Sequence, residues 1–308
     1  MQAIVYKSTG SWYIVQASNG NTFNARLKGV MKLDGITSTN PIAVGDEVNV
    51  EEDTESEKSV IITKILDRKN YIARISPHNK NQHHIVAANL DQVLLFATLK
   101  NPKTSSGFID RFLVSAEAFH VPAIIVFNKI DLYKKKELEL LQQMKKTYCA
   151  IGYNIIALSM ETKEGLSNLQ DILKDKTTLL SGHSGVGKST FINNIFPEKN
   201  LRTQEVSDWS GKGLHTTTFA EMFNLPFGGR IIDTPGIREF GLVDIEKAEL
   251  SHYFPEMRAL IHSCKFNNCM HIEEPGCAVT AAVAKGVISV ERYISYRNIL
   301  DTMDIKNY

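Results

Sequence analysis

One segment constrains the fold of this chain more than any other, because its glycines, lysine and serine have the spacing G-x-x-x-x-G-K-[ST]. The segment consists of Gly182, His183, Ser184, Gly185, Val186, Gly187, Lys188 and Ser189, with Thr190 directly after them. It lies between a β-prone run and a helical segment, as a phosphate-binding loop (P-loop) requires. Its N–H groups and the helix N-terminus would bind phosphates, Lys188 would contact the β- and γ-phosphates, and the Ser189 hydroxyl would ligate Mg²⁺. The segment therefore predicts a nucleoside triphosphatase.

The pattern around this loop is that of an α/β fold with a parallel sheet, because strand-like and helix-like runs alternate. We predict strands over 91–99, 121–127, 154–158, 177–180, 218–224 and 230–232, and helices over 107–120, 134–150 and 167–174. Between the P-loop helix and the next strand, residues 200–215 predict a long mobile loop.

Two segments that follow strands predict that the base is guanine. Asp131 ends the motif Asn-Lys-Ile-Asp, and its carboxylate would accept hydrogen bonds from guanine N1–H and N2–H₂. Adenine would leave that carboxylate unpaired, and this argues against an ATP-dependent enzyme. The Lys129 stem would pack over the base, and Asn128 would brace the neighbouring loop. Ser159 fits a second guanine loop, in which backbone N–H groups near Met160 approach O6.

Two further segments would bind the metal ion and the γ-phosphate. Asp233 begins an Asp-Thr-Pro-Gly motif after a strand and would hold Mg²⁺ through water, while Gly236 would offer its N–H to the γ-phosphate. A threonine of the run 216–218, which follows His215, would bind Mg²⁺ through its hydroxyl and order the preceding loop only with GTP bound. The alternative is a β-prone threonine run that only starts a strand.

A cysteine- and histidine-rich stretch near the end of the chain predicts a metal site. Cys264, Cys269, His271 and Cys277 supply three thiolates and one imidazole, which is a full tetrahedral set for structural Zn²⁺. With four protein ligands no open position remains for catalysis. Reduced core cysteines beside a chance histidine are the alternative.

The regions on either side of the α/β segment predict two smaller domains. Residues 1–66 contain about five short β-prone runs separated by turn signals, which favours a small barrel of the OB type over a β-sandwich or an SH3-like barrel. Residues 245–308 are helical around the cysteine-rich loop. We therefore expect three domains, over 1–66, 67–244 and 245–308.

The amino-acid composition limits which partners this protein could bind through its overall charge. The 35 lysines and arginines almost balance the 34 aspartates and glutamates, and no segment forms a basic arm that would bind nucleic acid by bulk charge. We find no apolar run of about 18 residues or more and no signal-peptide pattern at the N-terminus. We therefore expect a cytoplasmic monomer that binds neither DNA nor a membrane, and any RNA contact must come from local patches.

The order of the motifs is permuted, because the guanine motif precedes the P-loop, whereas standard GTPases have the reverse order. A permuted GTPase with an N-terminal barrel and a Cys/Cys/His/Cys module resembles the bacterial ribosome small-subunit-dependent GTPase A family. The resemblance rests on the run 213–218, on the loop 182–190 and on the zinc pattern through Pro275, Gly276 and Cys277. It implies an OB barrel, a permuted GTPase domain and a helical zinc-binding domain, with GTP or GDP, Mg²⁺ and Zn²⁺ as cofactors.

The same resemblance implies an activity and a catalytic set. The family hydrolyses GTP under stimulation by the small ribosomal subunit and acts late in its maturation, so the subunit and its rRNA would be the partners. The Mg²⁺-binding threonine would be Thr217, with one residue of ambiguity toward Thr216 or Thr218. Ile237 stands where Ras-like GTPases carry a water-orienting glutamine, so His215 is the candidate substitute beside Lys188. The alternative function is a GTP-dependent switch that acts on a protein partner.

Overall fold

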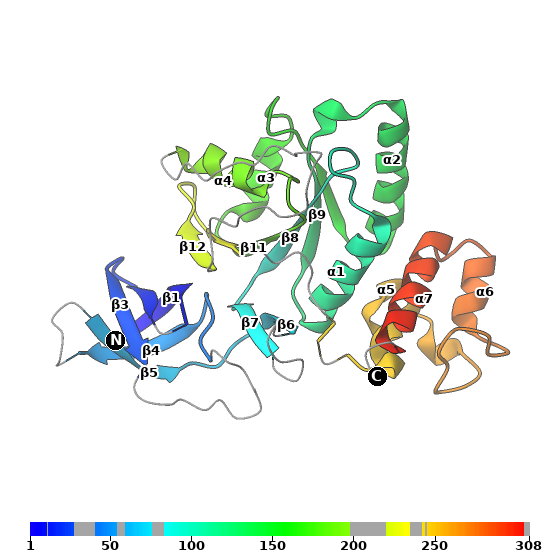
Figure 1. Cartoon of the computed structure of the whole chain (residues 1–308). Coiled ribbons are helices and arrows are strands. Elements are labelled where there is room, and N and C mark those ends of the chain that lie inside the picture. Colours follow the sequence, from blue (N-terminus) through cyan, green and yellow to red (C-terminus); the bar gives the residue numbers. More distant parts are fainter. Residues whose placement is uncertain are drawn as a thin grey trace.

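The computed structural model describes residues 1–10, 12–27, 41–53, 59–75, 83–197, 220–234, 242–243 and 245–304. Figure 1 shows a β-barrel at one end of the molecule, a central sheet with helices on both faces, and a helical part at the other end. We call the helical part, residues 245–304, the C-terminal module. No helix within the described ranges is long and apolar enough to cross a membrane.

Five strands of the described N-terminal part close into a barrel, in the order β1-β2-β3-β5-β4 with β4 pairing back onto β1. The β3–β5 pair is parallel, and the other pairs are antiparallel. Alternate side chains point inward and fill the barrel; Val5, Val15, Val48 and Ile62 are fully buried. The predicted OB-type barrel is confirmed. Its strands are β1 (Gln2–Ser8), β2 (Tyr13–Ala17), β3 (Thr22–Leu27), β4 (Glu47–Glu52) and β5 (Ser59–Ile65).

The central part of the sheet has the order β10-β9-β8-β11-β13-β12, and within it only β12 is antiparallel to its neighbour. The other side of β12 pairs antiparallel with β1, so the barrel and the central strands form one continuous sheet. All residues of β8 are buried, because helices cover both faces of a parallel sheet. The strands are β8 (Gln92–Ala97), β9 (Ala123–Phe127), β10 (Asn154–Ala157), β11 (Thr177–Ser181), β12 (Glu221–Asn224) and β13 (Arg230–Asp233). The predicted α/β fold is therefore confirmed.

Four helices cover this sheet, two on each face. Val93 and Leu95 face the core of α1 and α2, whereas Leu94 and Phe96 face the core of α3 and α4, as the period of two in a strand dictates. The helices are α1 (Ser106–Ala118), α2 (Lys135–Ala150), α3 (Leu166–Leu173) and α4 (Lys188–Ile195), with a short 3-10 helix η1 (Ile130–Leu132).

A hairpin that the sequence analysis did not predict lies between the barrel and the central sheet. It consists of β6 (Tyr71–Ile75) and β7 (His83–Ala88). Val44 of the barrel pairs with Ala87, and a Cβ at Gly45 would lie 2.2 Å from the Ala88 carbonyl oxygen. An isolated two-stranded hairpin is marginal in water, so tertiary contacts of this kind stabilise it.

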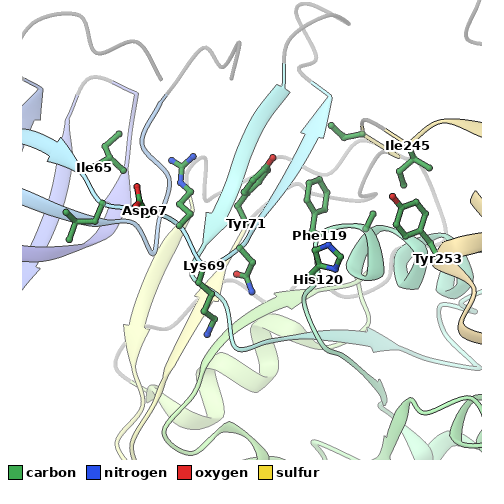
Figure 2. A pocket seen from close by; sticks show the side chains of 13 residues that line it. Ile65, Asp67, Lys69, Tyr71, Phe119, His120, Ile245 and Tyr253 are labelled. Carbon is green, nitrogen blue, oxygen red and sulfur yellow. The ribbon is translucent and has the colours of Figure 1, made fainter. Parts of the chain in front are cut away.

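The C-terminal module packs on α1, through a core that includes Val114, Phe254 and Tyr296. The first helical segment of this region is a 3-10 helix over 247–253, separated by Phe254 from the α-helix that begins at Pro255. The elements are η3 (Lys247–Tyr253), α5 (Pro255–Arg258), η4 (Ile261–Ser263), α6 (Ala278–Ala284) and α7 (Val290–Asp304). The linker from the barrel passes between the barrel and these elements, beside the end of α1 (Figure 2).

Candidate nucleotide-binding site and zinc site

The predicted nucleotide motifs gather at one edge of the central sheet. The P-loop follows β11, the Asn-Lys-Ile-Asp motif follows β9, Ser159 comes shortly after β10, and Asp233 ends β13. These strands are parallel, so their carboxyl ends meet at the same edge, which is where open α/β sheets bind ligands.

Two glycines of the P-loop are required by close contacts. Gly182 has φ +133°, and a Cβ there would lie 2.3 Å from the Phe96 carbonyl oxygen. Gly187 has φ +104°, and a Cβ there would lie 2.2 Å from Nδ2 of Asn128. The loop therefore lies directly against β8 and against the guanine motif, and any larger residue would push it away from both.

Asn128 joins the three predicted nucleotide segments. Its Nδ2 donates to the Val186 carbonyl oxygen of the P-loop at 2.9 Å, and this contact is buried. Its Oδ1 accepts from the Lys129 N–H at 2.7 Å and from the Met160 N–H at 3.3 Å. One side chain thus fixes the P-loop, the guanine motif and the second guanine loop relative to one another.

Asp131 and Ser159 lie together at the outer side of this arrangement. Ser159 Oγ donates to Oδ1 of Asp131 at 2.5 Å and accepts from the N–H groups of Glu161 and Thr162. The Asp131 side chain is otherwise exposed, so its second oxygen is accessible to a base. Lys129 adopts the left-handed conformation, and its Nζ donates to the Asn101 carbonyl oxygen at 2.6 Å. Burial lowers the pKa of Lys129, although Asp131 opposes this.

Lys188 and Asp233 form the polar centre of the site. Lys188 Nζ donates to the carbonyl oxygens of Gly182 at 2.5 Å and of His183 at 2.8 Å. Burial lowers the pKa of Lys188 to about 8, with Asp233 acting in the opposite direction. Burial likewise raises the pKa of Asp233, against the attraction of Lys188. A half-buried cation, a nearby carboxylate and the Ser189 hydroxyl form a set that suits a phosphate chain with Mg²⁺.

The P-loop makes an aromatic contact that its sequence pattern does not predict. The His183 ring stacks on the Phe108 ring of α1, with 3.7 Å between centroids and 29° between planes. Phe108 lies near the start of α1, and nothing in its local pattern distinguishes it from an ordinary helix residue. Only the fold brings the two rings together.

Several predicted site residues cannot be placed. All of the loop predicted over 200–215, which includes His215, lies outside the described residues, as do Thr216, Thr217, Thr218, Gly236 and Ile237. The described part of the site therefore includes the segments predicted to contact the base and the P-loop, but not the threonine run 216–218 or Gly236.

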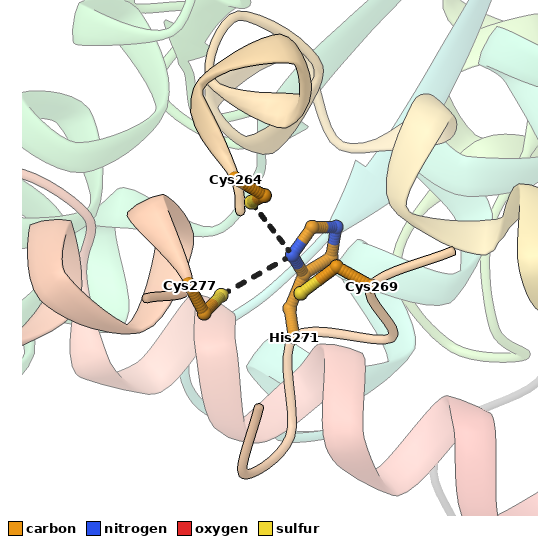
Figure 3. Close-up of side chains that lie close together, drawn as sticks. All are labelled: Cys264, Cys269, His271 and Cys277. Atoms are coloured by element: carbon orange, nitrogen blue, oxygen red, sulfur yellow. Dashed lines mark hydrogen bonds between the residues drawn. The ribbon is translucent and has the colours of Figure 1, made fainter. Parts of the chain in front are cut away.

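The predicted zinc ligands converge in the C-terminal module (Figure 3). One ligand atom from each of Cys264, Cys269, His271 and Cys277 lies within 4.8 Å of all the others. Nδ1 of His271 lies 3.6 Å from the Cys264 sulfur and 3.4 Å from the Cys277 sulfur. Three sulfurs and one ring nitrogen at such distances fit a tetrahedral Zn²⁺, whose bonds to sulfur are about 2.3 Å long.

Surrounding groups shape this cluster. Burial alone would raise the pKa of the Cys277 thiol, but N–H groups at the start of α6, that of Thr280 foremost, lower it overall, which favours a thiolate. The carboxylate of Glu274 accepts from the N–H groups of Met270 and Ile272 and so fixes the loop that carries His271. The Tyr293 hydroxyl donates to the His271 carbonyl oxygen at 2.7 Å. The loop is thus held in shape around the ligands.

Comparison with known proteins gives consistent matches over the whole chain. The family model described as RsgA GTPase matches residues 65–243, and the model described as RsgA N-terminal domain matches residues 2–61. A protein of Flavobacterium psychrophilum named small ribosomal subunit biogenesis GTPase RsgA is 51% identical over 99% of this chain and 94% of its own length. A protein of the same name from Bacteroides fragilis is 48% identical over 100% of this chain and 99% of its own.

Two solved structures resemble the chain as a whole. YjeQ from Thermotoga maritima matches with a TM-score of 0.78 and 34% identity, over 98% of this chain and 97% of that structure. YloQ, described as a circularly permuted GTPase, matches with a TM-score of 0.76 and 29% identity, over 100% of this chain and 96% of that structure.

Proposed function

Because the chain belongs to the RsgA GTPase family, we propose that it hydrolyses GTP in the service of small ribosomal subunit biogenesis. The observation that supports this proposal is the buried hydrogen bond from Asn128 Nδ2 to the Val186 carbonyl oxygen, which joins the segment that carries Asp131 to the P-loop. Two relatives that are 51% and 48% identical to this chain, over 94% and 99% of their own length, are named small ribosomal subunit biogenesis GTPase RsgA.

In the proposed complex the base meets Asp131 and the backbone near Met160, while the phosphates lie in the loop 182–190. Lys188 neutralises the phosphate chain, and Ser189 and Asp233 hold Mg²⁺ directly or through water. The metal would supply electrostatic stabilisation of the charge that develops on the transferred phosphoryl group. We further propose that Thr217 and Gly236 contact Mg²⁺ and the γ-phosphate, and that His215 orients the attacking water.

We propose that the nucleotide state controls binding to the subunit. Leu242, only nine residues beyond Asp233, already packs in the core of the C-terminal module. A change at the γ-phosphate therefore has a short covalent route to that module. In this scheme the barrel and the C-terminal module bind rRNA with GTP and release it late in maturation, after hydrolysis. The Cys/His cluster would hold Zn²⁺ and so stabilise the module. Because the four residues would occupy all four positions of the metal, none would remain for catalysis.

The GTPase rate with and without purified small subunits tests this function. We expect strong stimulation of the wild-type protein and none of Lys188→Ala. Subunit affinity should be higher with a non-hydrolysable GTP analogue than with GDP. His215→Ala should bind nucleotide normally and lose the stimulated rate. A wild-type rate that subunits leave unchanged would instead favour a switch that acts on a protein partner.

Two properties of the free protein complete the proposal. We propose that it is a cytoplasmic monomer; the segments of the predicted GTP site that the structure describes and the four predicted zinc ligands all come from one chain, so neither site requires a second copy. Light scattering at micromolar concentration should give the mass of one chain, 34.5 kDa.

A further inference from the structure

A groove lies where the barrel, the GTPase part and the C-terminal module meet, and the nucleotide site does not use it. Its volume is about 500 Å³, within the range of pockets that hold small ligands. Its walls come from the linker 65–71, from residues 118–120 at the end of α1, and from Val243, Ile245 and Tyr253. We call it the junction groove.

Aromatic side chains dominate the middle of the junction groove. Figure 2 shows Tyr71 and Phe119 side by side, with Ile65 and Asp67 of the linker on one side and Ile245 and Tyr253 on the other. The rings of Tyr71 and Phe119 are 5.3 Å apart between centroids and tilted by 51°. All three aromatic residues are only partly buried, so ring surface remains accessible in the groove.

Cationic and hydrogen-bonding groups lie around these rings. The lining includes Asp67 and the two cations Arg68 and Lys69, each of which is paired with a carboxylate outside the lining. Arg68 is fixed by the buried carboxylate of Asp46, to which its Nε and Nη2 donate at 2.6 and 2.7 Å. Lys69 pairs with Asp91 at the surface, and its side chain is 56% exposed. His120 is exposed at the end of α1 and adds a second kind of donor.

We propose that the junction groove binds an unpaired nucleotide of the small-subunit rRNA, with its base against the aromatic rings and its phosphate toward Lys69 and His120. Proteins read single-stranded RNA by stacking unpaired bases on aromatic side chains beside a cationic backbone track. The groove also adjoins a five-stranded barrel of a type that binds oligonucleotides. This inference rests on the proposed function, because that function supplies the RNA.

The position of the groove gives such a contact a consequence for the whole molecule. A nucleotide seated there would touch the barrel linker, α1 and the segment that begins the C-terminal module. The bound RNA would therefore fix the arrangement of the three parts. This effect requires a ligand that contacts all three parts at the same time.

Tyr253 offers the sharpest test, because its ring can be removed or retained. Tyr253→Ala should weaken binding of the GTP-analogue-bound protein to small subunits by roughly 5- to 150-fold, the range measured for loss of one base–aromatic stack. Tyr253→Phe keeps the ring and should bind within about twofold of wild type. A second control is Leu138→Ala, an exposed apolar residue of α2 outside the groove, which should also bind normally.

Because Tyr253 also touches the core of the module, a second variant removes a group with few packing contacts. His120→Asn suits its φ of +54°, since asparagine tolerates this conformation, and it should weaken binding without lowering the thermal midpoint. Each variant should keep the wild-type GTPase rate in the absence of subunits.

Crosslinking identifies the class of occupant. Small subunits substituted with 4-thiouridine should crosslink on irradiation to peptides that contain Tyr71 or Tyr253. RNA crosslinks only to other peptides of the protein, or variants that all bind like wild type, would overturn the inference while leaving the proposed function intact. A wild-type protein that neither binds subunits nor responds to them would overturn both.

Discussion

Removing the guanidinium of Arg292 should destabilise the contact between the C-terminal module and the GTPase part. This side chain of α7 is 2% exposed, and its Nη1 donates to Oδ1 of Asp110 in α1 at 2.7 Å. Its Nε and Nη2 donate to the two carboxylate oxygens of Glu256 at 2.7 and 3.1 Å. The guanidinium also lies over the Phe254 ring, 4.5 Å from its centroid, and Tyr148 donates to the same oxygen of Asp110.

The expected loss of unfolding free energy follows from the charged groups that Arg292→Met leaves without a partner. Burial alone would lower the pKa of Arg292, but Asp110 and Glu256 outweigh it and raise the pKa above its ordinary value, so this is a charged, fully paired group. Arg292→Met keeps the length of the side chain and leaves two carboxylates without their cation. Oδ2 of Asp110 already has no partner among the described residues. Removing one partner of a buried ion pair costs about 3–5 kcal/mol, and we expect that loss here.

Urea unfolding followed by circular dichroism measures this loss, and the same interface supplies a matched control. Arg258 of α5 pairs with Glu117 of α1 at 3.0 Å, but its side chain is 51% exposed. Arg258→Met should therefore cost at most about 1 kcal/mol. Arg292→Lys keeps a charge but loses the planar fork, so it should fall between the two. Equal losses for Arg292→Met and Arg258→Met would refute the assignment of the buried network as the main link between these parts.

Three further outcomes are expected. Asp131→Asn offers an N–H where guanine needs an acceptor, so GTP affinity should fall at least tenfold and xanthosine triphosphate should compete better, as measured by nucleotide competition. Gly187→Ala places a Cβ 2.2 Å from Asn128 and at a positive φ, so GDP affinity by calorimetry should drop severely while the thermal midpoint of the barrel stays unchanged. Cys264→Ser should reduce bound zinc, measured by atomic absorption, and lower the unfolding midpoint of the C-terminal module; a strong chelator should have the same effect on the wild type.

Local chemistry explains why much of the candidate site could be predicted from the sequence. The spacing of the P-loop glycines, the carboxylate after β9 and the four metal ligands each reflect a requirement that acts over a few residues. Buried strands such as β8 and β9 are continuous apolar runs, and the turn signals between barrel strands are equally local. These features can be predicted before any tertiary contact is known.

Other features could not be predicted, because their stabilisation comes from distant residues. The β6–β7 hairpin is short, and it depends on pairing with Val44 and on the core beneath it. Arg292 gave one signal that could have been used: it shares the face of α7 that buries Tyr296 and Ile299, and an arginine on a buried face requires a charged partner. The identity of that partner, Asp110 on a helix 182 residues away, was not readable.

By itself the sequence determined which chemical groups this protein carries: a glycine-rich loop with Lys188 and Ser189, an aspartate three residues beyond Asn128, three cysteines with a histidine, and the permuted order of these motifs. The tertiary structure alone decided how these parts act together, through the bond from Asn128 to the P-loop, the stack of His183 on Phe108 and the junction groove between three separate stretches of chain. The physical reason is that chemical identity belongs to a side chain and its neighbours in sequence. Contacts between remote segments depend instead on strand order and helix packing, which many different sequences can produce.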